Sequence, residues 1–152
     1  MAILLLGKTV CPICGVVIQD GQKSVSFPAF VGNQLDPLFL FHDAVFHEEC
    51  FCQHPLAETA TMLLREMQVK TAPRNRRCAV CGQPINDPDD YFALGHLVTD
   101  NAHALFPYNY AQFHRNCLPK WSHRAYVKDL LVDLQASGKW QGDSLKWILA
   151  RL

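Results

Sequence analysis

The chain has 152 residues, of which 49% are apolar, so it can form one compact domain or two very small ones. Fourteen acidic and fourteen basic residues balance, whereas a protein that works mainly by neutralising phosphates carries a clear basic excess. This composition excludes a largely disordered chain, argues against a nucleic-acid binder, and leaves a protein partner open.

The N-terminal residues 1–7 are apolar, but they are too few to span a membrane or to form a secretory signal. We expect a β-strand over Ile3–Leu6 and no interaction with a membrane. Without an export signal we expect a reducing, cytoplasmic setting, in which cysteines remain thiols or metal thiolates. The odd number of cysteines, seven, also does not fit a complete set of disulfides.

Two motifs, Cys-x-x-Cys-Gly and Phe-His-x-x-Cys, each occur twice, and the second copy lies 67 positions after the first. In both copies 32 residues separate the second cysteine from the histidine, so the match needs no gap. Apolar positions such as Ile18 and Ile85 recur in the same register. The sequence therefore predicts two copies of one supersecondary unit. The recurring candidate metal ligands are Cys11, Cys14, His47, Cys50, Cys78, Cys81, His114 and Cys117.

Three cysteines and one histidine form a standard closed shell for a structural Zn²⁺ ion. A glycine after each cysteine pair, Gly15 or Gly82, permits the tight turn that brings both sulfurs to one ion. His47 and Cys50 are spaced i and i+3, which places both side chains on one face at the start of a helix, and their counterparts repeat this spacing. We therefore expect two structural zinc ions, one in each unit. Redox chemistry at the Cys-x-x-Cys pairs, or disulfides in an exported protein, would leave the His-x-x-Cys motifs unexplained.

Strand character between the ligand pairs predicts a β-hairpin in each unit, with Asn33 or Asn101 at its turn. Each unit is thus expected to contain a Cys-x-x-Cys knuckle, a hairpin, and a helix that carries the last two ligands. The expected strands, in chain order, are Ser24–Phe27, Phe39–Phe41, Tyr91–Leu94 and Ala104–Phe106.

Apolar residues at helical spacing predict a helix over Leu56–Val69 between the copies. After the second copy the same spacing predicts a helix over Tyr126–Leu134, and then a short last helix capped by Asp143 or Ser144. The expected organisation is a first zinc unit with its following helix over 1–69, a basic connector over 70–77, and a second zinc unit with C-terminal helices over 78–152.

This arrangement resembles the treble-clef zinc-finger superfamily over residues 11–50 and 78–117, and its tandem pairing is similar to that of LIM domains. The resemblance implies an α+β fold of two tandem treble-clef-like zinc units with a C-terminal helical tail. The 32-residue spacing is longer than is usual in a LIM finger, and a helix separates the two fingers. The superfamily includes adaptors, nucleic-acid binders and nucleases, so the resemblance leaves the function open.

Several polar residues are left over from the repeat. Cys52 is the seventh cysteine, and because its counterpart is Pro119 we expect a small thiol that is buried or half-buried. Five histidines have no histidine counterpart, and His42 (next to Asp43) and His96 are the best candidates among them for a further site.

By elimination we expect a zinc-stabilised protein-binding or adaptor module, as in a bacterial accessory or immunity-type protein. The first alternative is a nucleic-acid-binding zinc protein, with the basic run Lys70, Arg74, Arg76 and Arg77 on phosphates and Tyr108 and Tyr110 stacking on bases. The second is a treble-clef nuclease-like enzyme, which we do not expect because a closed four-ligand shell leaves no position for a water molecule.

Overall fold

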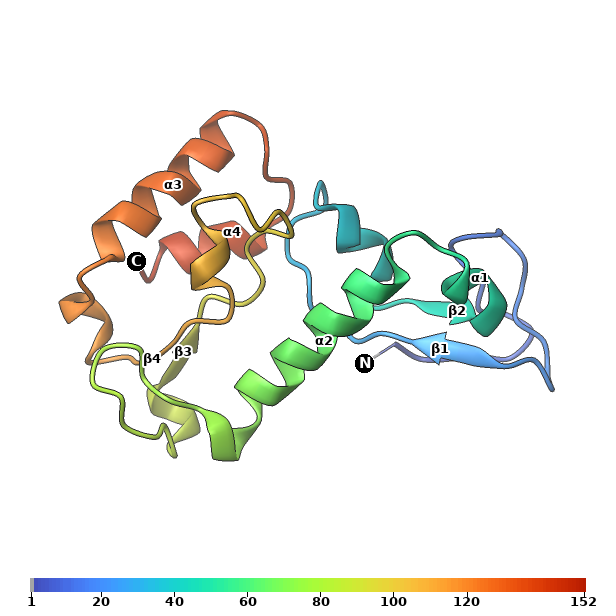
Figure 1. Ribbon diagram of the computed structural model, residues 1–152, viewed down its shortest axis with the longest axis horizontal. Coiled ribbons are helices and arrows are strands. Elements are labelled where there is room, and N and C mark those ends of the chain that lie inside the picture. Colours follow the sequence, from blue (N-terminus) through green and yellow to red (C-terminus); the bar gives the residue numbers. More distant parts are fainter. Residues whose placement is uncertain (1) are drawn as a thin grey trace.

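The computed structural model describes residues 2–152 and shows two lobes, between which one long helix runs diagonally (Figure 1). Each lobe contains a two-stranded antiparallel sheet. In the first, β1 (Ser24–Ser26) pairs with β2 (Val45–His47), and in the second, β3 (Tyr91–Ala93) pairs with β4 (Gln112–His114). The register is the same in both sheets, since Ser24 faces His47 in one and Tyr91 faces His114 in the other.

Four α-helices complete the mixed α/β fold: α1 (Glu48–Cys52), α2 (Ala57–Thr71), α3 (Arg124–Ala136) and α4 (Ser144–Leu149). The described chain also contains short 3-10 helices at Pro37–Phe41, Pro73–Asn75, Pro88–Asp90, Phe106–Tyr108 and Leu118–Lys120. Within residues 2–152, every helix is too short or too polar to cross a membrane.

The helices α2 and α3 occupy the same place in the two copies, because α3 starts 67 positions after α2. Their buried faces also match: Ala60 corresponds to Val127, and both are fully buried against the core of their own lobe. The repeated unit is therefore longer than the ligand set. The first repeat spans residues 9–71 and the second repeat spans residues 76–138, and the tail that follows carries α4.

The two hydrophobic cores are built from different side chains. The core of the first lobe centres on Phe27, whose ring lies 5.2 Å from that of Phe51 and 5.5 Å from that of Phe41, centroid to centroid. The core of the second lobe is mainly aliphatic, with Phe113 against Trp121 at 4.7 Å. The C-terminal tail belongs to this second core through its buried residues Leu145, Ile148 and Leu152.

The first strand predicted for each hairpin is confirmed, as β1 and β3, but the second is wrong. The residues predicted as second strands lie in turns and 3-10 helices, and the residues that pair are those leading into each histidine ligand. In the first lobe the Asp36 carboxylate accepts a hydrogen bond from the backbone N–H of Leu38 at 2.9 Å, and Pro37 opens the helix. Both features start a helix rather than a strand. The wrongly predicted strands are Phe39–Phe41 and Ala104–Phe106.

The strand predicted over Ile3–Leu6 is also wrong. The backbone N–H of Leu5 donates to the Thr9 hydroxyl at 2.8 Å, and the N–H of Lys8 donates to the Leu5 carbonyl at 3.0 Å. Gly7 completes this turn with a φ of 72°. The segment bends back on itself within a few residues, so it has no straight edge with which to pair.

The predicted ligand-bearing helix forms only in the first repeat. There α1 follows His47, and Cys50 lies in its middle. In the second repeat, residues 115–117 form a turn and a 3-10 helix begins at Leu118. Pro119 stands at the position of Cys52 and has no N–H with which to extend an α-helix.

The three other predicted helices are confirmed as α2, α3 and α4, with ends shifted by one or two residues. Asp143 occupies the N-cap position of α4 but does not cap it through its side chain. Its carboxylate instead pairs with the ammonium of Lys146 at 2.8 Å.

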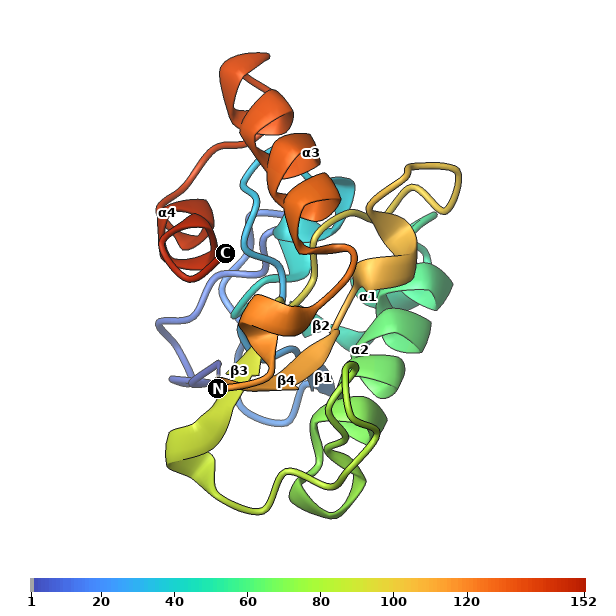
Figure 2. The same cartoon turned by 90° about the vertical axis from the view of Figure 1, so that its left-hand side faces the viewer.

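Polar contacts join the lobes, and Asp36 is at their centre. Its carboxylate accepts hydrogen bonds from the backbone N–H of Thr99 at 3.0 Å and from the Thr99 hydroxyl at 2.6 Å, and it lies 3.5 Å from Nε2 of His96. The predicted turn residue Asn33 is buried in the same region, where its amide donates to the Lys139 carbonyl at 3.0 Å. The tail thus contacts the first lobe, and in Figure 2 its helix α4 lies on the side of the molecule opposite to α2.

Candidate metal centres

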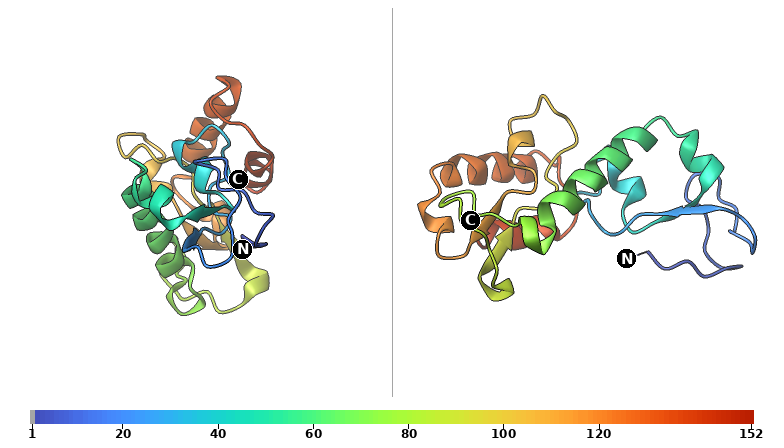
Figure 3. Two further views of the ribbon diagram at one scale, coloured as in Figure 1. Left: turned by 90° about the vertical axis from the view of Figure 1, so that its right-hand side faces the viewer. Right: turned by 60° about the horizontal axis from the view of Figure 1, so that its bottom comes forward.

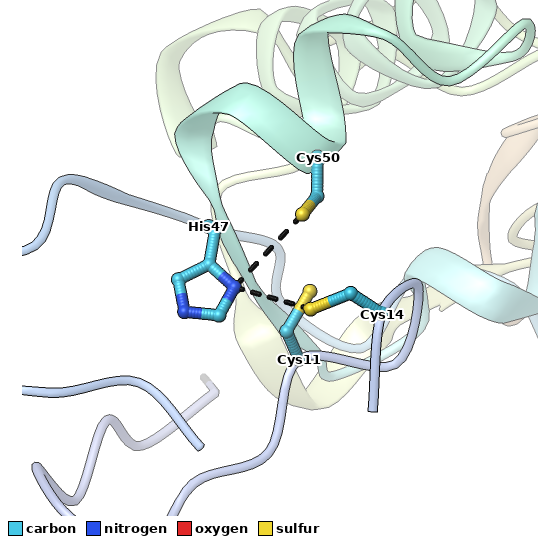
Figure 4. Close-up of side chains that lie close together, drawn as sticks. All are labelled: Cys11, Cys14, His47 and Cys50. Carbon is cyan, nitrogen blue, oxygen red and sulfur yellow. Dashed lines mark hydrogen bonds between the residues drawn. The ribbon is translucent and has the colours of Figure 1, made fainter. Parts of the chain in front are cut away.

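The four candidate ligands of the first repeat converge on one point (Figure 4). Cys11 and Cys14 come from the N-terminal knuckle, His47 ends β2, and Cys50 lies on α1. Nδ1 of His47 lies 3.4 Å from Sγ of Cys14 and 3.9 Å from Sγ of Cys50. A tetrahedral zinc ion with Zn–S of about 2.3 Å and Zn–N of about 2.0 Å would hold sulfur and nitrogen about 3.5 Å apart. The residues therefore have the spacing that such an ion requires.

The second repeat reproduces this group almost atom for atom. Nδ1 of His114 lies 3.4 Å from Sγ of Cys81 and 4.0 Å from Sγ of Cys117. In both groups the four ligand atoms lie within 4.8 Å of one another. The structure therefore brings all eight predicted residues together as two Cys₃His groups, which is consistent with two structural zinc ions.

The knuckles explain how the first cysteine of each pair is held. Gly15 and Gly82 have φ angles of 72° and 71°, and the N–H of each donates to the carbonyl of the first cysteine at 2.9 Å. Burial alone would raise the pKa of Cys11, but hydrogen bonds from backbone N–H groups, first that of Cys14, outweigh it and lower the pKa to about 6. The pKa of Cys78 falls to about 6 for the same reasons. Both sulfurs are therefore prepared to be thiolates, the form that binds a metal.

The last cysteine of each group behaves in the opposite way. Burial, followed by the neighbouring sulfur of Cys14, raises the pKa of Cys50 to about 11. In the second group burial and the sulfur of Cys81 raise the pKa of Cys117 to about 11. Several thiols packed this closely cannot all ionise unless a cation compensates their charge. The arrangement therefore favours a divalent cation at its centre.

The outer nitrogen of each histidine is also held, and the sequence did not indicate how. Nε2 of His47 lies 3.2 Å from the side-chain oxygen of Gln22, whereas Nε2 of His114 lies 3.3 Å from the carbonyl oxygen of Pro84. A proton on Nε2 leaves the lone pair of Nδ1 for the metal, so these contacts fix the tautomer and the ring orientation. Gln22 had no sequence signal, because its counterpart 67 positions later is Asp89.

The structure places His42 outside both groups. Its Nδ1 accepts a hydrogen bond from the backbone N–H of Val31 at 3.2 Å. In the second repeat the side-chain oxygen of Asn109 accepts from the N–H of Val98 at the same distance. Since Asn109 and His42 are counterparts, His42 holds a loop of the scaffold in the way that an asparagine does.

His96 is fully buried between the lobes. Its Nδ1 lies 3.1 Å from the hydroxyl of Tyr110, and its Nε2 lies 3.1 Å from the hydroxyl of Thr99. Nearby, hydrogen bonds from His96 and Thr99 outweigh the effect of burial and lower the pKa of Asp36. The imidazole thus joins Tyr110 to Thr99 within the second lobe, and its Nε2 also lies 3.5 Å from the carboxylate of Asp36 in the first lobe.

Cys52 is exposed, contrary to the expectation of a buried or half-buried thiol. The last turn of α1 directs Phe51 into the core, which leaves the next side chain on the solvent side.

The basic run is partly engaged within the chain. The guanidinium of Arg76 lies 4.3 Å from the ring centre of Tyr91, and the ammonium of Lys70 lies 2.6 Å from the carboxylate of Glu66. The suggestion that Tyr110 stacks on bases is wrong, because this side chain is only 2% exposed.

Comparison of the chain with models of protein families, with curated proteins and with solved structures gives no match, so the two Cys₃His groups themselves are the basis for assigning a role.

Proposed function

We propose that the protein is a zinc-stabilised protein-binding module built from two tandem treble-clef-like units. Each Cys₃His group would hold one structural Zn²⁺ ion through its four side chains. The bound ion would cross-link the knuckle, the hairpin and the segment after it. The closed set of four ligands supports a structural ion rather than a catalytic one, which would keep an open position.

One observation carries the binding role: an exposed apolar surface at the N-terminus. We call it the N-terminal apolar surface, and its six large side chains are between 37% and 73% exposed. The segment is fastened to the first knuckle, because the N–H of Gly7 donates to the Ile18 carbonyl at 2.9 Å. Apolar side chains gathered in this way on a small protein mark a contact surface. The surface consists of Ile3, Leu4, Leu5, Leu6, Val10 and Val16.

The positions 67 residues later show that the fold does not require this surface. Val10 and Val16 correspond to Arg77 and Gln83, which are exposed as well. The repeated unit is thus stable with polar residues at these two positions, which supports a binding role for the apolar ones in the first repeat. An accessory or immunity-type protein, which acts by covering part of a partner, would use such a face.

The nucleic-acid alternative has less support. Net charge is zero, and two of the four cations in the basic run are engaged with Glu66 and Tyr91. The enzyme alternative has to rely on His42 and His96, and both contribute hydrogen bonds to the scaffold. We therefore favour a protein partner.

A photo-crosslinking amino acid at position 16, with the matched control at position 83, would test this role inside the producing cell. Val16 lies in the N-terminal apolar surface, and Gln83 is its exposed counterpart after the second knuckle. We expect a discrete protein adduct from position 16 that is absent from position 83 and is lost when Leu4 and Leu6 are changed to serine. Adducts only with lipid or nucleic acid, or equal adducts from both positions, would contradict the proposal.

A further inference from the structure

We propose that two copies of this chain associate through the outer face of α2, with their α2 helices packed antiparallel about a two-fold axis. This interface is separate from the N-terminal apolar surface. It therefore goes beyond the proposed function and does not depend on it. Helix α2 lies at the front of the molecule in the right-hand view of Figure 3.

The outer face of α2 carries two large apolar side chains among its polar ones, where a solvent-facing helix is normally polar throughout. Met62 is 59% exposed and Val69 is 56% exposed, and both lie on the side of the helix opposite to its buried residues Ala60 and Leu63. Together with Phe51 and Ala57 they line a shallow groove of about 720 Å³ that runs along the helix. A groove of this kind receives apolar side chains from a second surface.

The counterpart helix α3 shows that this apolar face is not a requirement of the fold. Asp129 stands at the position of Met62, and Ala136 stands at the position of Val69. Glu58 and Arg65 correspond to Ala125 and Val132, so α3 has neither the exposed methionine nor the pair of charges that α2 carries on this side.

The charges on this face identify a second copy as the occupant. Glu58 and Arg65 both line the groove, and within residues 2–152 neither belongs to an ion pair. They are seven residues apart, about 10.5 Å along the helix axis, so they cannot pair with each other. No residue three or four positions from either one carries the opposite charge.

An antiparallel pair of α2 helices satisfies both charges at once. With the two-fold axis between Thr61 and Met62, Glu58 of each copy lies opposite Arg65 of the other copy. The same axis brings the exposed Met62 side chain of each copy beside that of the other copy. The face is thus complementary to itself in charge and in apolar contact, as an isologous interface must be.

Such a dimer would present the N-terminal apolar surface twice. A partner with two copies of its own binding site would then be held more tightly than by either contact alone.

Sedimentation of the intact, zinc-loaded chain over a concentration series tests the interface. We expect a reversible monomer–dimer equilibrium. Arg65→Glu sets like charges opposite each other and should weaken dimerisation by roughly tenfold or more, and Glu58→Arg should do the same. The double variant Glu58→Arg/Arg65→Glu restores opposite charges across the axis and should recover the dimer. Met62→Asp, which introduces the residue found in α3, should abolish it.

Asp129→Lys on the outer side of α3, at the counterpart of Met62, is the matched control and should leave the equilibrium unchanged. Zinc content and circular dichroism of each variant show whether it is folded. A chain that is monomeric at every concentration would overturn the proposal. So would a dimer that survives Met62→Asp, or a double charge swap that is no better than the single reversals.

Discussion

The two repeats share a backbone but differ in what they place on its two sides. The N–H of Phe27 donates to the Ala44 carbonyl at 2.9 Å in the first repeat, and the N–H of Leu94 donates to the Ala111 carbonyl at 3.0 Å in the second. Each donor and acceptor is 67 positions from its counterpart. Between the repeats, the core becomes more aliphatic, and the exposed residues Val10, Val16 and Met62 are replaced by Arg77, Gln83 and Asp129. The comparison shows that the hydrogen bonds and the metal group define the unit, while the side chains around them are free to change.

Two residues with left-handed backbone conformation also show that the unit fixes the backbone and leaves the side chains free to change. Asp43 and Tyr110 are counterparts, and both have a positive φ, of 50° and 62°. A tyrosine is uncommon in this region of φ/ψ space. It persists because the N–H of Tyr110 donates to the Gly95 carbonyl at 2.7 Å, as the N–H of Asp43 donates to that of Pro28. The turn before the histidine strand is thus imposed by the unit and not by the residue type.

The strongest way to separate the repeats is to remove one metal at a time. Cys11→Ser and Cys78→Ser should each unfold mainly their own lobe, because a structural zinc ion contributes on the order of 10 kcal/mol and small domains are stable by only about 5–15 kcal/mol. Hydrogen–deuterium exchange resolves the lobes. Full protection of both lobes in either variant would show that the repeats do not depend on their own metals.

Breaking the contact between the lobes should cause the next largest loss of stability. Asp36→Ala leaves the half-buried N–H and hydroxyl of Thr99 without their acceptor, and should cost about 2–4 kcal/mol. His103 is the counterpart of Asp36, and within residues 2–152 its side chain accepts one hydrogen bond, from the N–H of Leu105 at 3.1 Å. His103→Ala should therefore cost only about 0.5–1 kcal/mol. Denaturant unfolding measures both, and equal losses would remove the distinction drawn between these positions.

The two sites should respond to pH in the same way. Because the pKa of Cys50 and of Cys117 is raised to about 11, these thiols hold their protons at neutral pH in the metal-free fold, and zinc must displace them. Affinity should therefore rise by about tenfold per pH unit for each displaced proton between about pH 6 and pH 8. Below pH 6 the slope should steepen, since Cys11 and Cys78, with pKa values of about 6, also take up protons. Competition titrations with a chelator at several pH values measure the slopes, and different slopes at the two sites would argue against equivalent chemistry.

The smallest expected effect is on zinc affinity, and it comes from removing the group that contacts Nε2 of a histidine ligand. Gln22→Ala removes the side-chain contact to His47 and should weaken zinc at the first site by about tenfold. Asp89→Ala, at the counterpart position, should leave the second site unchanged, because His114 contacts the backbone of Pro84. Chelator competition measures the zinc affinity of one site by itself when a cysteine of the other site is substituted. A loss at both sites, or at neither, would contradict the assigned supports.

The sequence predicts the ligand groups well because their information is local. Each Cys-x-x-Cys and His-x-x-Cys pair lies within four residues, and the constant offset links the pairs. The same offset also carried a signal for the equivalence of α2 and α3, since Ala60 and Met67 correspond to the apolar residues Val127 and Leu134. This signal lies in residues beyond the two cysteine and histidine motifs.

The remaining features depend either on a local helix-start signal that competes with strand composition or on contacts between distant residues. Phe39–Phe41 has the composition of a strand, yet the Asp36 carboxylate and Pro37 begin a 3-10 helix there. Asp36 in turn meets Thr99, 63 positions away in the sequence. The turn in place of a second ligand helix could have been predicted, because Pro119 stands where Cys52 stands in the first repeat.

The central claim, one zinc ion in each repeat, is tested most directly by native mass spectrometry of the intact chain and of the variants Cys14→Ser and Cys81→Ser. The duplicated Cys₃His geometry predicts two zinc ions in the wild type and one in each variant, with the retained ion in the unsubstituted repeat. A wild-type chain that carries no zinc and contains intramolecular disulfides between these cysteines would contradict the account.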